Sequence, residues 1–453
     1  MSDKLQRRLF HIYSVGSLLG FATKQRVSSL GWLLLVGVPS VGFMCLIYPR
    51  DTLFRLFGIL AALIIVAFFA ALSRRAKLRV NRHMPAYGTV GETIEYTVEC
   101  ANSGRFTLAN YYLQDLAPDP RPSKPLFLNG REPGEELRNG FDRRYLAYRW
   151  MWMTRRRLLF KSKPMMGETL AVGAKGTMRL QFSPLRRGVI QMERMQVILP
   201  DPMGVFQRVS RAEQESDTLI VLPKRYAFDG VNFQGQSRNQ LGGDSTSSLA
   251  GQSGEFVSLR EYRPGDPPKH IHWPSWGKAG KPIIKEYEDI FFPRYGLILD
   301  TAVKAEQEDI FEEAISIAAT FACSVDTEQA LLDLMFVQQG ARVVTVGKNV
   351  ERVDKMLEVL AGLEMESQPD WEALRKMVLS HADALTTCIV VLCDWNDERA
   401  HLVNRLAASG VQLCVLLVID GENEPVLVED SSVSIVQIKV GQAEAGLSAL
   451  ARF

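Results

Sequence analysis

Two uncharged apolar stretches near the N-terminus decide the fold. Residues 30–48 read LGWLLLVGVPSVGFMCLIY and residues 56–72 read LFGILAALIIVAFFAAL, with Pro49, Arg50 and Asp51 in the short connection. A helix needs about 20 apolar residues to cross a bilayer core, with a range of roughly 17–25. Both stretches qualify and are apolar on all sides, so residues 30–73 predict a transmembrane hairpin of two helices. The alternatives are a buried helical pair in a soluble protein and a signal peptide, but the first stretch lacks an A-x-A-like cleavage site.

The basic residues around this hairpin predict its orientation. The turn offers only Arg50 and Arg55, and Asp51 offsets them. The basic residues outside the hairpin are Lys4, Arg7, Arg8, Lys24 and Arg26 before it, and Arg74, Arg75, Lys77, Arg79 and Arg82 after it. Because cytoplasmic segments carry the excess of Lys and Arg, we expect residues 1–29 and everything after the hairpin to be cytoplasmic.

The composition limits the classes of protein that this chain can belong to. Its 453 residues leave room for about three domains, at roughly 100–200 residues per domain. Hydrophobic residues make up 47% and charged residues 23%, which excludes a disordered or collagen-like chain. The net charge of +2 says nothing about a nucleic-acid partner, so only local clusters can. The six cysteines form no CxxC pair and agree with a reducing compartment.

Residues 76–225 have the pattern of an antiparallel, immunoglobulin-like β-sandwich. Residues 93–100 (TIEYTVEC) alternate with period two, and Asn102-Ser103-Gly104 ends that run. Further strands are expected at 108–113, 176–182, 187–192 and 195–199. Many short strands between turn signals favour a sandwich. No catalytic spacing occurs here, so we interpret this stretch as a structural or protein-contact domain.

Residues 141–163 (FDRRYLAYRWMWMTRRRLLFKSK) form a basic and aromatic insert in this domain. Tyr and Trp favour the headgroup region of a bilayer, and each basic residue near anionic lipid contributes about 1 kcal/mol. We therefore expect the insert to rest on the inner leaflet through Arg149, Trp150, Trp152, Arg155, Arg156 and Arg157. A solvated hairpin with ordinary aromatic packing and a site for single-stranded nucleic acid are the alternatives.

Residues 226–292 combine a linker with the most distinctive motif of the chain. Residues 235–254 (GQSRNQLGGDSTSSLAGQSG) are rich in Gly, Ser and Gln, which predicts a flexible loop. The motif then reads GEFVSLREYRPGD at 254–266, HIHW at 270–273 and GKPIIKEYE at 280–288.

This motif resembles the signature of the DUF58 family of bacterial proteins. The resemblance extends to Arg186-Arg187-Gly188-Val189 and to residues 201–206 (DPMGVF), so it spans most of the chain. The sequence departs from the family pattern at residues 274–277 (PSWG). The resemblance implies a von Willebrand factor A-like domain at the C-terminus, a place in the bacterial inner membrane, and an association with MoxR-type AAA+ ATPases and transglutaminase-like membrane proteins. It implies no established catalytic activity.

The charged residues of the motif admit two interpretations. Arg forks favour bidentate contacts with carboxylates, and Pro264-Gly265-Asp266 predicts a turn that holds an acid. One interpretation is a surface that docks a protein partner, and the other is an internal salt-bridged clasp that locks the linker to the next domain. The residues concerned are Arg260, Glu261, Arg263, Asp266, His270, His272, Trp273, Lys281, Lys285 and Glu286.

His270 and His272 are also candidate ligands of a metal site. Residues two apart in a strand point to one face, so both imidazoles could bind one metal. A site needs a third or fourth ligand, for which Asp266 and Glu261 are the nearest candidates. Packing or hydrogen-bonding histidines are the alternative.

Residues 293–453 alternate between strand and helix patterns. Buried strands are expected at 295–300, 330–337, 387–394 and 412–419, and helices at 308–325, 350–363, 371–381 and 396–409. This rhythm predicts a mostly parallel sheet covered by helices, in which ligands bind beyond the carboxyl ends of the strands. Asp300 and Asp394 end two of these strands.

The family resemblance places Asp300 and Asp394 near the divalent-metal site of a von Willebrand A domain. That site resembles D-x-S-x-S, but residues 300–304 read DTAVK, so both serines are missing. Hard cations need several oxygen ligands. We therefore expect a degenerate, metal-free site in which Thr301 remains and Lys304 pairs with an acid.

The leading hypothesis is a non-catalytic adaptor in the membrane that presents its soluble domains to cytoplasmic proteins, without a cofactor or nucleic acid. The family resemblance suggests a MoxR-type ATPase as the partner. No P-loop, G-x-S-x-G or H-E-x-x-H motif occurs in the sequence. The alternatives are a metal-dependent enzyme that uses His270 and His272 or Asp300 and Asp394, and a membrane-surface or nucleic-acid sensor that uses the insert.

Overall fold

The computed structural model describes residues 3–73, 75–228, 255–288, 293–303, 307–325, 327, 330–347, 352–366, 370–421 and 435–450. The predicted loop at 235–254, Arg74 and Lys304 lie outside these residues. The chain divides into two compact units. The first contains residues 1–226, 303–320 and 357–367, and the second contains residues 227–302, 321–356 and 368–453.

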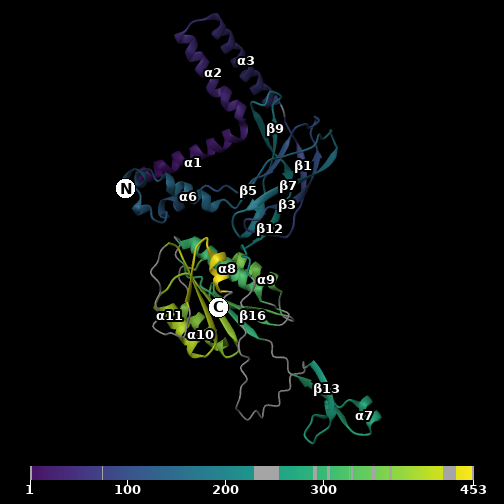
Figure 1. Cartoon of the computed structure of the whole chain (residues 1–453). Helices are drawn as coiled ribbons and strands as arrows, with labels where there is room; N and C mark the ends of the chain where they lie inside the picture. The colour runs from purple at the N-terminus through teal and green to yellow at the C-terminus, as the bar shows by residue number, and fades with distance from the viewer. Residues whose placement is uncertain are drawn as a thin grey trace. The chain divides into compact units, whose positions relative to one another are not determined.

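Three helices begin the first unit: α1 (Asp3–Arg26), α2 (Ser29–Ile47) and α3 (Asp51–Ser73). Helices α2 and α3 run side by side away from the strands of this unit (Figure 1). Both are long and apolar enough to cross a membrane, and only 11% of each apolar window is buried. The predicted pair of apolar helices is therefore confirmed, and α1 adds a long helix that the sequence pattern did not reveal.

The β-sandwich-like region of the first unit has three sheets. They have the strand orders β11-β1-β3-β7-β5, β10-β9-β4-β6 and β2-β12-β8. The longest strands are β3 (Ile94–Asn102) and β7 (Lys175–Pro184). The other strands are β1 (Leu78–His83), β2 (Tyr87–Thr89), β4 (Tyr112–Asp115), β5 (Phe160–Ser162), β6 (Met165–Met166), β8 (Gly188–Met192), β9 (Met195–Pro200), β10 (Gln207–Arg211), β11 (Glu213–Gln214) and β12 (Asp217–Leu222).

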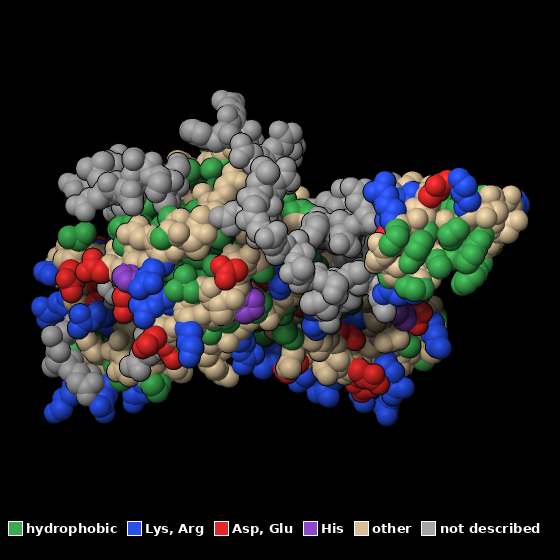
Figure 2. Space-filling model, turned by 90° about the horizontal axis from the view of Figure 1, so that it is seen from below, with side chains coloured by type: hydrophobic (Ala, Val, Ile, Leu, Met, Phe, Trp, Pro, Cys, Tyr) green, Lys and Arg blue, Asp and Glu red, His purple; other side chains and the backbone are tan. Residues whose placement is uncertain are grey.

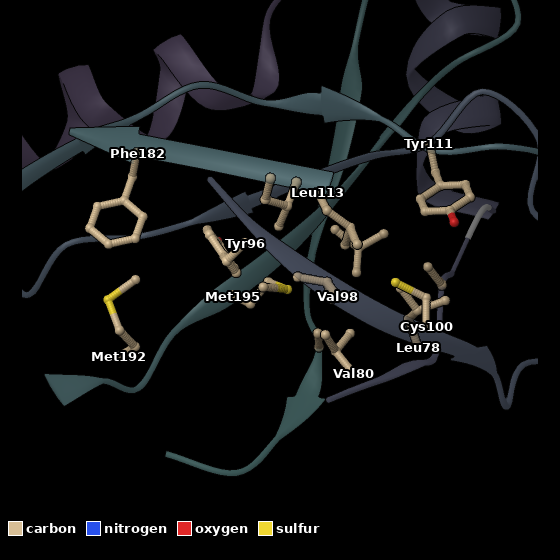
Figure 3. Packing of buried hydrophobic residues seen from close by; sticks show 14 of the residues in the cluster. Leu78, Val80, Tyr96, Val98, Cys100, Tyr111, Leu113, Phe182, Met192 and Met195 are labelled. Carbon is tan, nitrogen blue, oxygen red and sulfur yellow. The ribbon is translucent and has the colours of Figure 1, made fainter. Parts of the chain in front are cut away.

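The alternation in β3 produces the core of this region. Its residues are buried at every second position, and Val98 lies close to Leu113 and Met195 of the neighbouring sheet (Figure 3). The expected strands at 93–100, 176–182, 187–192 and 195–199 are present within a few residues. The strand expected at 108–113 is shorter and begins at Tyr112, while Leu108 forms only an isolated bridge with Leu170.

Most of the insert folds as helices, and its last residues form β5. The segment between β4 and β5 holds α4 (Lys124–Asn129), the 3-10 helix η1 (Glu135–Leu137), α5 (Gly140–Tyr145) and α6 (Ala147–Arg157). The hairpin of the alternative interpretation is thus a pair of short helices, and the aromatic packing of that interpretation is present in the contact of Trp150 with Phe127. Leu146, with φ at +55°, ends α5 and caps α6, so the chain turns sharply between them.

The second unit contains a six-stranded sheet and a separate hairpin. The sheet has the order β17-β16-β15-β18-β19-β20, and all its pairs are parallel except β16 with β17. This confirms the predicted mostly parallel sheet. Its strands are β15 (Arg294–Leu299), β16 (Leu331–Val337), β17 (Ala341–Val346), β18 (Thr387–Leu392), β19 (Gln412–Ile419) and β20 (Ile435–Lys439).

The helices of this part are α10 (Trp371–Ala382), α11 (Asp397–Ala408) and α12 (Ala443–Leu450). Two further helices, α8 (Glu308–Ser324) and α9 (Val353–Gly362), are divided between the two units. The hairpin consists of β13 (Glu255–Glu261) and β14 (Ile283–Glu288), with the 3-10 helix η2 (Pro268–His270) and α7 (Trp273–Ala279) between them.

Candidate functional site

The DPMGVF segment forms a tight loop at the base of the apolar helices. The Asp201 carboxylate accepts hydrogen bonds from the backbone amides of Val205 and Phe206 at 2.7 and 3.2 Å. Gly204 has a φ of +70°, a value that side chains other than glycine rarely adopt. The Asp and Gly of this segment therefore have a conformational role, because they hold the loop closed.

This loop binds the start of α2. The backbone amide of Ser28 donates to the carbonyl of Val205 at 3.1 Å, and the Ser28 hydroxyl donates to the carbonyl of Gly204. The same hydroxyl caps α2 by accepting from the amide of Gly31 at 2.9 Å. A side chain at Gly31 would place its Cβ 2.3 Å from the Val205 oxygen, so only glycine fits there.

The same loop also contacts α3. The ring of Phe206 lies edge-on to the ring of Phe68, with centroids 6.0 Å apart. Val27, just before the cap, forms a β-bridge with Phe206. Residues 201–206 therefore fasten both apolar helices to the sandwich, a role that the sequence motif did not reveal.

The RRG segment makes a second set of contacts within the first unit. Arg186 pairs with Glu308 and Arg187 pairs with Glu312. Arg187 also donates to the carbonyls of Leu360, at 3.0 Å, and Leu363. These carbonyls lie at the end of α9, where backbone oxygens lack partners within the helix. Arg186 and Arg187 therefore bind α8, and Arg187 also binds the end of α9.

In the motif hairpin, Arg260 and Asp266 form a bidentate ion pair. The two guanidinium nitrogens lie 2.7 and 2.9 Å from the carboxylate oxygens. The backbone amide of Arg263 donates to the same carboxylate at 2.8 Å. These bonds, the Arg260 guanidinium first, lower the pKa of Asp266 to about 2. The pair joins the end of β13 to the Pro264-Gly265 turn, which is what the clasp interpretation requires of these two residues.

The two histidines of the motif do not lie in a strand, which corrects the expectation that they share a strand face. Pro267 and Pro268 start a 3-10 helix that ends at His270, and His272 precedes α7. The His272 Nδ1 atom lies 2.7 Å from the Ser275 hydroxyl oxygen. Among the residues that the structure describes, no three His, Cys, Asp or Glu side chains form a group that could hold a metal ion.

Trp273 and Trp276 of the motif form an aromatic surface, in which Trp273 is exposed and Trp276 is half-buried. Trp273 is 66% exposed and stacks on Trp276, with ring centroids 5.2 Å apart and an interplanar angle of 17°. Leu259 on β13 is exposed as well. Figure 2 shows apolar side chains gathered on the lobe at the right of the view, with charged side chains beside them. The sequence pattern did not single out Trp276 among the candidate residues.

Of the other charged candidate residues of the motif, Glu261, Arg263 and Lys281 are exposed. Glu261 and Lys281 form an exposed ion pair of 3.3 Å, and Lys285 is half-buried on β14. The side chain of Glu286 lies outside the described part of the chain. An exposed pair of this kind contributes about 0–1 kcal/mol, so it adds little to the clasp.

At the end of β15 in the parallel sheet, the Asp300 carboxylate forms an ion pair with an arginine. The Arg399 Nε atom lies 2.8 Å from the Asp300 carboxylate, and both side chains are almost fully buried. The amides of Cys393 and Ala302 donate to the same carboxylate at 3.1 and 2.9 Å. Burial raises the pKa of Asp300, and Arg399 and the two amides oppose this rise.

The other residues of the expected degenerate site have different partners. The Thr301 hydroxyl donates to the carbonyl of Val337 at 2.6 Å. Asp394 is exposed and accepts a hydrogen bond from the amide of Trp395 at 2.9 Å. The partner of the strand-end acid is Arg399 in the first turn of α11, a residue that the sequence pattern did not indicate. Lys304, the partner expected from the sequence, lies outside the described part.

The insert does not present all its predicted residues to a membrane. Arg149 and Trp150 are buried, which corrects the expectation that they rest on a leaflet. Arg149 pairs with Glu135 and donates to the carbonyl of Phe127 at 3.2 Å. Trp150 belongs to a small core with residues of α1, among them Leu9.

Of the four remaining predicted residues of the insert, two make contacts that hold them to the protein and two are exposed. The guanidinium of Arg156 lies over the Trp152 ring, 4.3 Å from its centroid, and pairs with Glu308 at 2.9 Å. Arg155 and Arg157 are exposed. The main role of the insert in the described structure is to pack against α1.

Comparisons with known proteins show a distant relative that matches about half of this chain. No protein-family model matches the chain. The "Uncharacterized protein YeaD" of Bacillus subtilis (strain 168) is 26% identical over 210 residues, which are 46% of this chain and 46% of that protein. The match thus spans about half the length of this curated relative.

Solved structures share only a general likeness with the chain. One is the CARDB domain of a Pyrococcus furiosus protein, which is 11% identical with a TM-score of 0.16. The match covers 32% of this chain and 89% of that domain's chain. A cohesin module from a Clostridium perfringens family 33 glycoside hydrolase, at 9% identity and the same TM-score, covers 32% of this chain and 98% of its own. Likenesses this distant say nothing about function.

Proposed function

We propose that this chain is a membrane-anchored, non-catalytic adaptor that docks a cytoplasmic protein partner through its motif hairpin. The two apolar helices would anchor it in the bacterial inner membrane with both ends cytoplasmic. The observation that carries the docking role is the exposed ring of Trp273, which stacks on the half-buried Trp276. Trp and Arg are the residues that most often dominate the energy of protein interfaces.

The surroundings of the stack support this role. A docking surface works best when it is held in its bound shape before the partner arrives. The Arg260–Asp266 pair and the pairing of β13 with β14 hold the hairpin at both ends of the motif. Glu261 and Lys281 add exposed charges of both signs near the aromatic surface. The hairpin therefore combines a rigid frame, an aromatic centre and a polar rim.

The class of partner rests on the DUF58 resemblance. That resemblance suggests a MoxR-type AAA+ ATPase, and a transglutaminase-like membrane protein as a second member of the assembly. Neither partner follows from the geometry. The partner must therefore be identified by mass spectrometry.

The test is crosslinking in native membranes, followed by purification of the tagged full-length chain and mass spectrometry. We expect an AAA+ ATPase to be crosslinked to residues 255–288. Trp273→Ala should reduce its recovery about tenfold, the effect of losing about 1.4 kcal/mol of binding. Phe141→Ala, which removes an exposed aromatic residue outside the motif, is the matched control. Equal recovery with both variants, or no ATPase with the unmodified chain, would refute the proposal.

A further inference from the structure

One half of α1 packs against the insert. At 100° per residue, Leu9, Phe10 and Tyr13 fall in one half of the helix circumference. The rings of Phe10 and Tyr13 each lie 5.9 Å from the ring of Trp150, measured between centroids. The Tyr13 hydroxyl donates to the carbonyl of Tyr145 at 2.7 Å. The insert therefore acts as a support for α1.

The other half of α1 is mainly apolar and exposed. The exposed apolar residues on this half are Ile12, Val15, Leu18, Leu19 and Phe21, and the exposed His11 lies among them. Four of them, at positions 12, 15, 18 and 19, fall within about a third of the circumference. A helix of a soluble domain normally presents one apolar face to its core and a polar face to water. Here the face that points away from the supporting core is also apolar.

Basic residues lie at both ends of this apolar face. Lys4, Arg8 and Arg26 are exposed and fall in the same half of the helix as the exposed apolar residues. No Asp or Glu occurs between Asp3 and Asp51. Long basic side chains at the ends of an apolar face can reach the headgroups while their stems cover apolar surface. The charge pattern is thus complementary to an anionic lipid surface.

The junction between α1 and α2 fixes where this face lies. Val27 and Ser28, the only residues between the two helices, are bonded to Phe206, Gly204 and Val205. In Figure 1, α1 leaves this junction at a steep angle to α2, and the insert lies on the opposite side of α1 from the apolar hairpin. With α2 across a bilayer, α1 would run along the bilayer surface, and the half away from the insert would face the lipid.

We infer that α1 is an interfacial helix whose apolar half is embedded in the anionic cytoplasmic leaflet and whose other half rests on the insert. This inference rests on the proposed membrane anchoring, because α2 must span the bilayer to place α1 at its surface. An interfacial helix of this type combines a polar face with basic residues and an apolar face with Phe and Leu. The membrane-surface role expected of Arg149 and Trp150 is thus assigned to α1, which packs against Trp150.

The test is photocrosslinking with the full-length chain in vesicles of phosphatidylcholine and phosphatidylglycerol. A p-benzoylphenylalanine residue replaces Leu19 on α1, Leu46 on α2 or Val189 on the sandwich. These residues are 56%, 81% and 61% exposed, so the probe does not disturb a core at any of them. Mass spectrometry then measures the yield of lipid adducts. We expect the yield at position 19 to approach that at position 46 and to exceed that at position 189 about tenfold.

The controls separate this inference from the proposed anchoring. Lipid adducts at position 46 without adducts at position 19 would overturn the interfacial helix and leave the anchoring intact. An absence of adducts at both positions would overturn both. A crosslink from position 19 to a second copy or to another protein would identify a protein partner for this face and overturn the lipid assignment.

The basic residues can be tested in the same experiment. In vesicles of phosphatidylcholine alone, we expect the yield at position 19 to fall at least about fivefold, since the loss of anionic lipid removes about 1 kcal/mol, a factor of about five, for each basic residue near the surface. The yield at position 46 should not change, because α2 is held by its apolar length. An equal yield at position 19 in both kinds of vesicle would refute the role of the basic residues.

Discussion

The amide of Ser28 donates a hydrogen bond to the carbonyl of Val205, although 177 residues separate them in the chain. Ser28 is the last residue before the first apolar helix, and Val205 lies in the DPMGVF loop of the sandwich. This bond and the Ser28 side chain fix the direction in which α2 leaves the folded domain. Residues 201–206 thus act at the junction between the sandwich and the two apolar helices.

Gly31 provides the most direct test of that junction. A Gly→Ala change within a helix normally stabilises it by about 0.5–1 kcal/mol. At position 31, however, the new Cβ would lie 2.3 Å from the Val205 oxygen, which is backbone and cannot rotate away. We expect Gly31→Ala to destabilise the first unit by about 1–3 kcal/mol, the usual cost of overpacking.

The measurement is thermal unfolding of the full-length protein in detergent. Each kcal/mol lowers Tm by about 2–4 °C in a domain of this size. Gly37 lies in the same helix, and a Cβ added there would meet no other group within 4 Å, so Gly37→Ala is the matched control. A Gly31→Ala protein as stable as the Gly37→Ala protein would show that the loop does not bind α2 closely.

The Asp300–Arg399 pair should be essential to the parallel sheet. Arg399→Leu leaves a buried carboxylate without its counterion, which costs about 3–5 kcal/mol. The double variant Asp300→Asn with Arg399→Leu should lose less than Arg399→Leu alone, because no charge remains buried. Hydrogen exchange in β15 and β18, corrected for intrinsic rates, measures these losses.

The same variant has a predictable pH dependence. Burial raises the pKa of Asp300, and removal of Arg399 takes away the main group that opposes this rise. In Arg399→Leu the folded state then binds a proton more readily than the unfolded state, so stability falls as the pH rises. We expect a smaller loss of stability at pH 5 than at pH 8. A loss independent of pH would mean that Asp300 has found another counterion.

The elements with strong local periodicity were predictable from sequence, and the partners of charged residues were not. Helices α2 and α3 and the buried strands could be predicted because their side chains are apolar throughout or at every second position. Such patterns fit only a membrane, a buried core or one buried face. Helix α1 was not predicted because apolar residues occur on both halves of its circumference and therefore do not form one apolar stripe. Only contact with the insert, more than 100 residues away in the chain, distinguishes the two halves.

The candidate site shows the same limit. Arg260 and Asp266 were predictable, because they lie six residues apart and meet across a turn. Arg399 was not, because it reaches Asp300 across 99 residues through the sheet. For His270 and His272 the period-two expectation was wrong, because Pro267 and Pro268 favour a 3-10 turn over a strand. The insert was ambiguous since buried protein surfaces and membrane surfaces both use Trp and Arg.

The thiol of Cys323 should report the orientation of the protein in the membrane. Cys323 is the only exposed one of the six cysteines, all of which the structure describes. Burial raises the pKa of Cys100 to about 12 and that of Cys414 to about 11, which leaves little thiolate to react at neutral pH. A membrane-impermeant maleimide should therefore label Cys323 rapidly in sealed inverted vesicles and not in right-side-out vesicles. Cys323→Ser is the control, and rapid labelling from the outside would reverse the proposed topology.

The Arg260–Asp266 clasp should survive mild acid. The pKa of Asp266 in the folded hairpin is about 2, below its ordinary value of 3.8. Because the folded pKa is the lower one, the pair stabilises the hairpin fully above about pH 4 and loses this effect as the pH falls through about 2. Corrected hydrogen exchange of residues 255–266 should therefore stay constant from pH 7 to 4 and increase below that range.

A pair of variants separates the clasp from exposed charges nearby. Asp266→Asn should raise exchange in the hairpin at pH 7, because it removes the charge that Arg260 and the Arg263 amide both bind. Glu261→Gln removes only an exposed pair with Lys281 and should have little effect. If the two variants exchanged equally, the hairpin would owe its shape to strand pairing alone. The tryptophan stack would then lack the rigid support on which the proposed docking role depends.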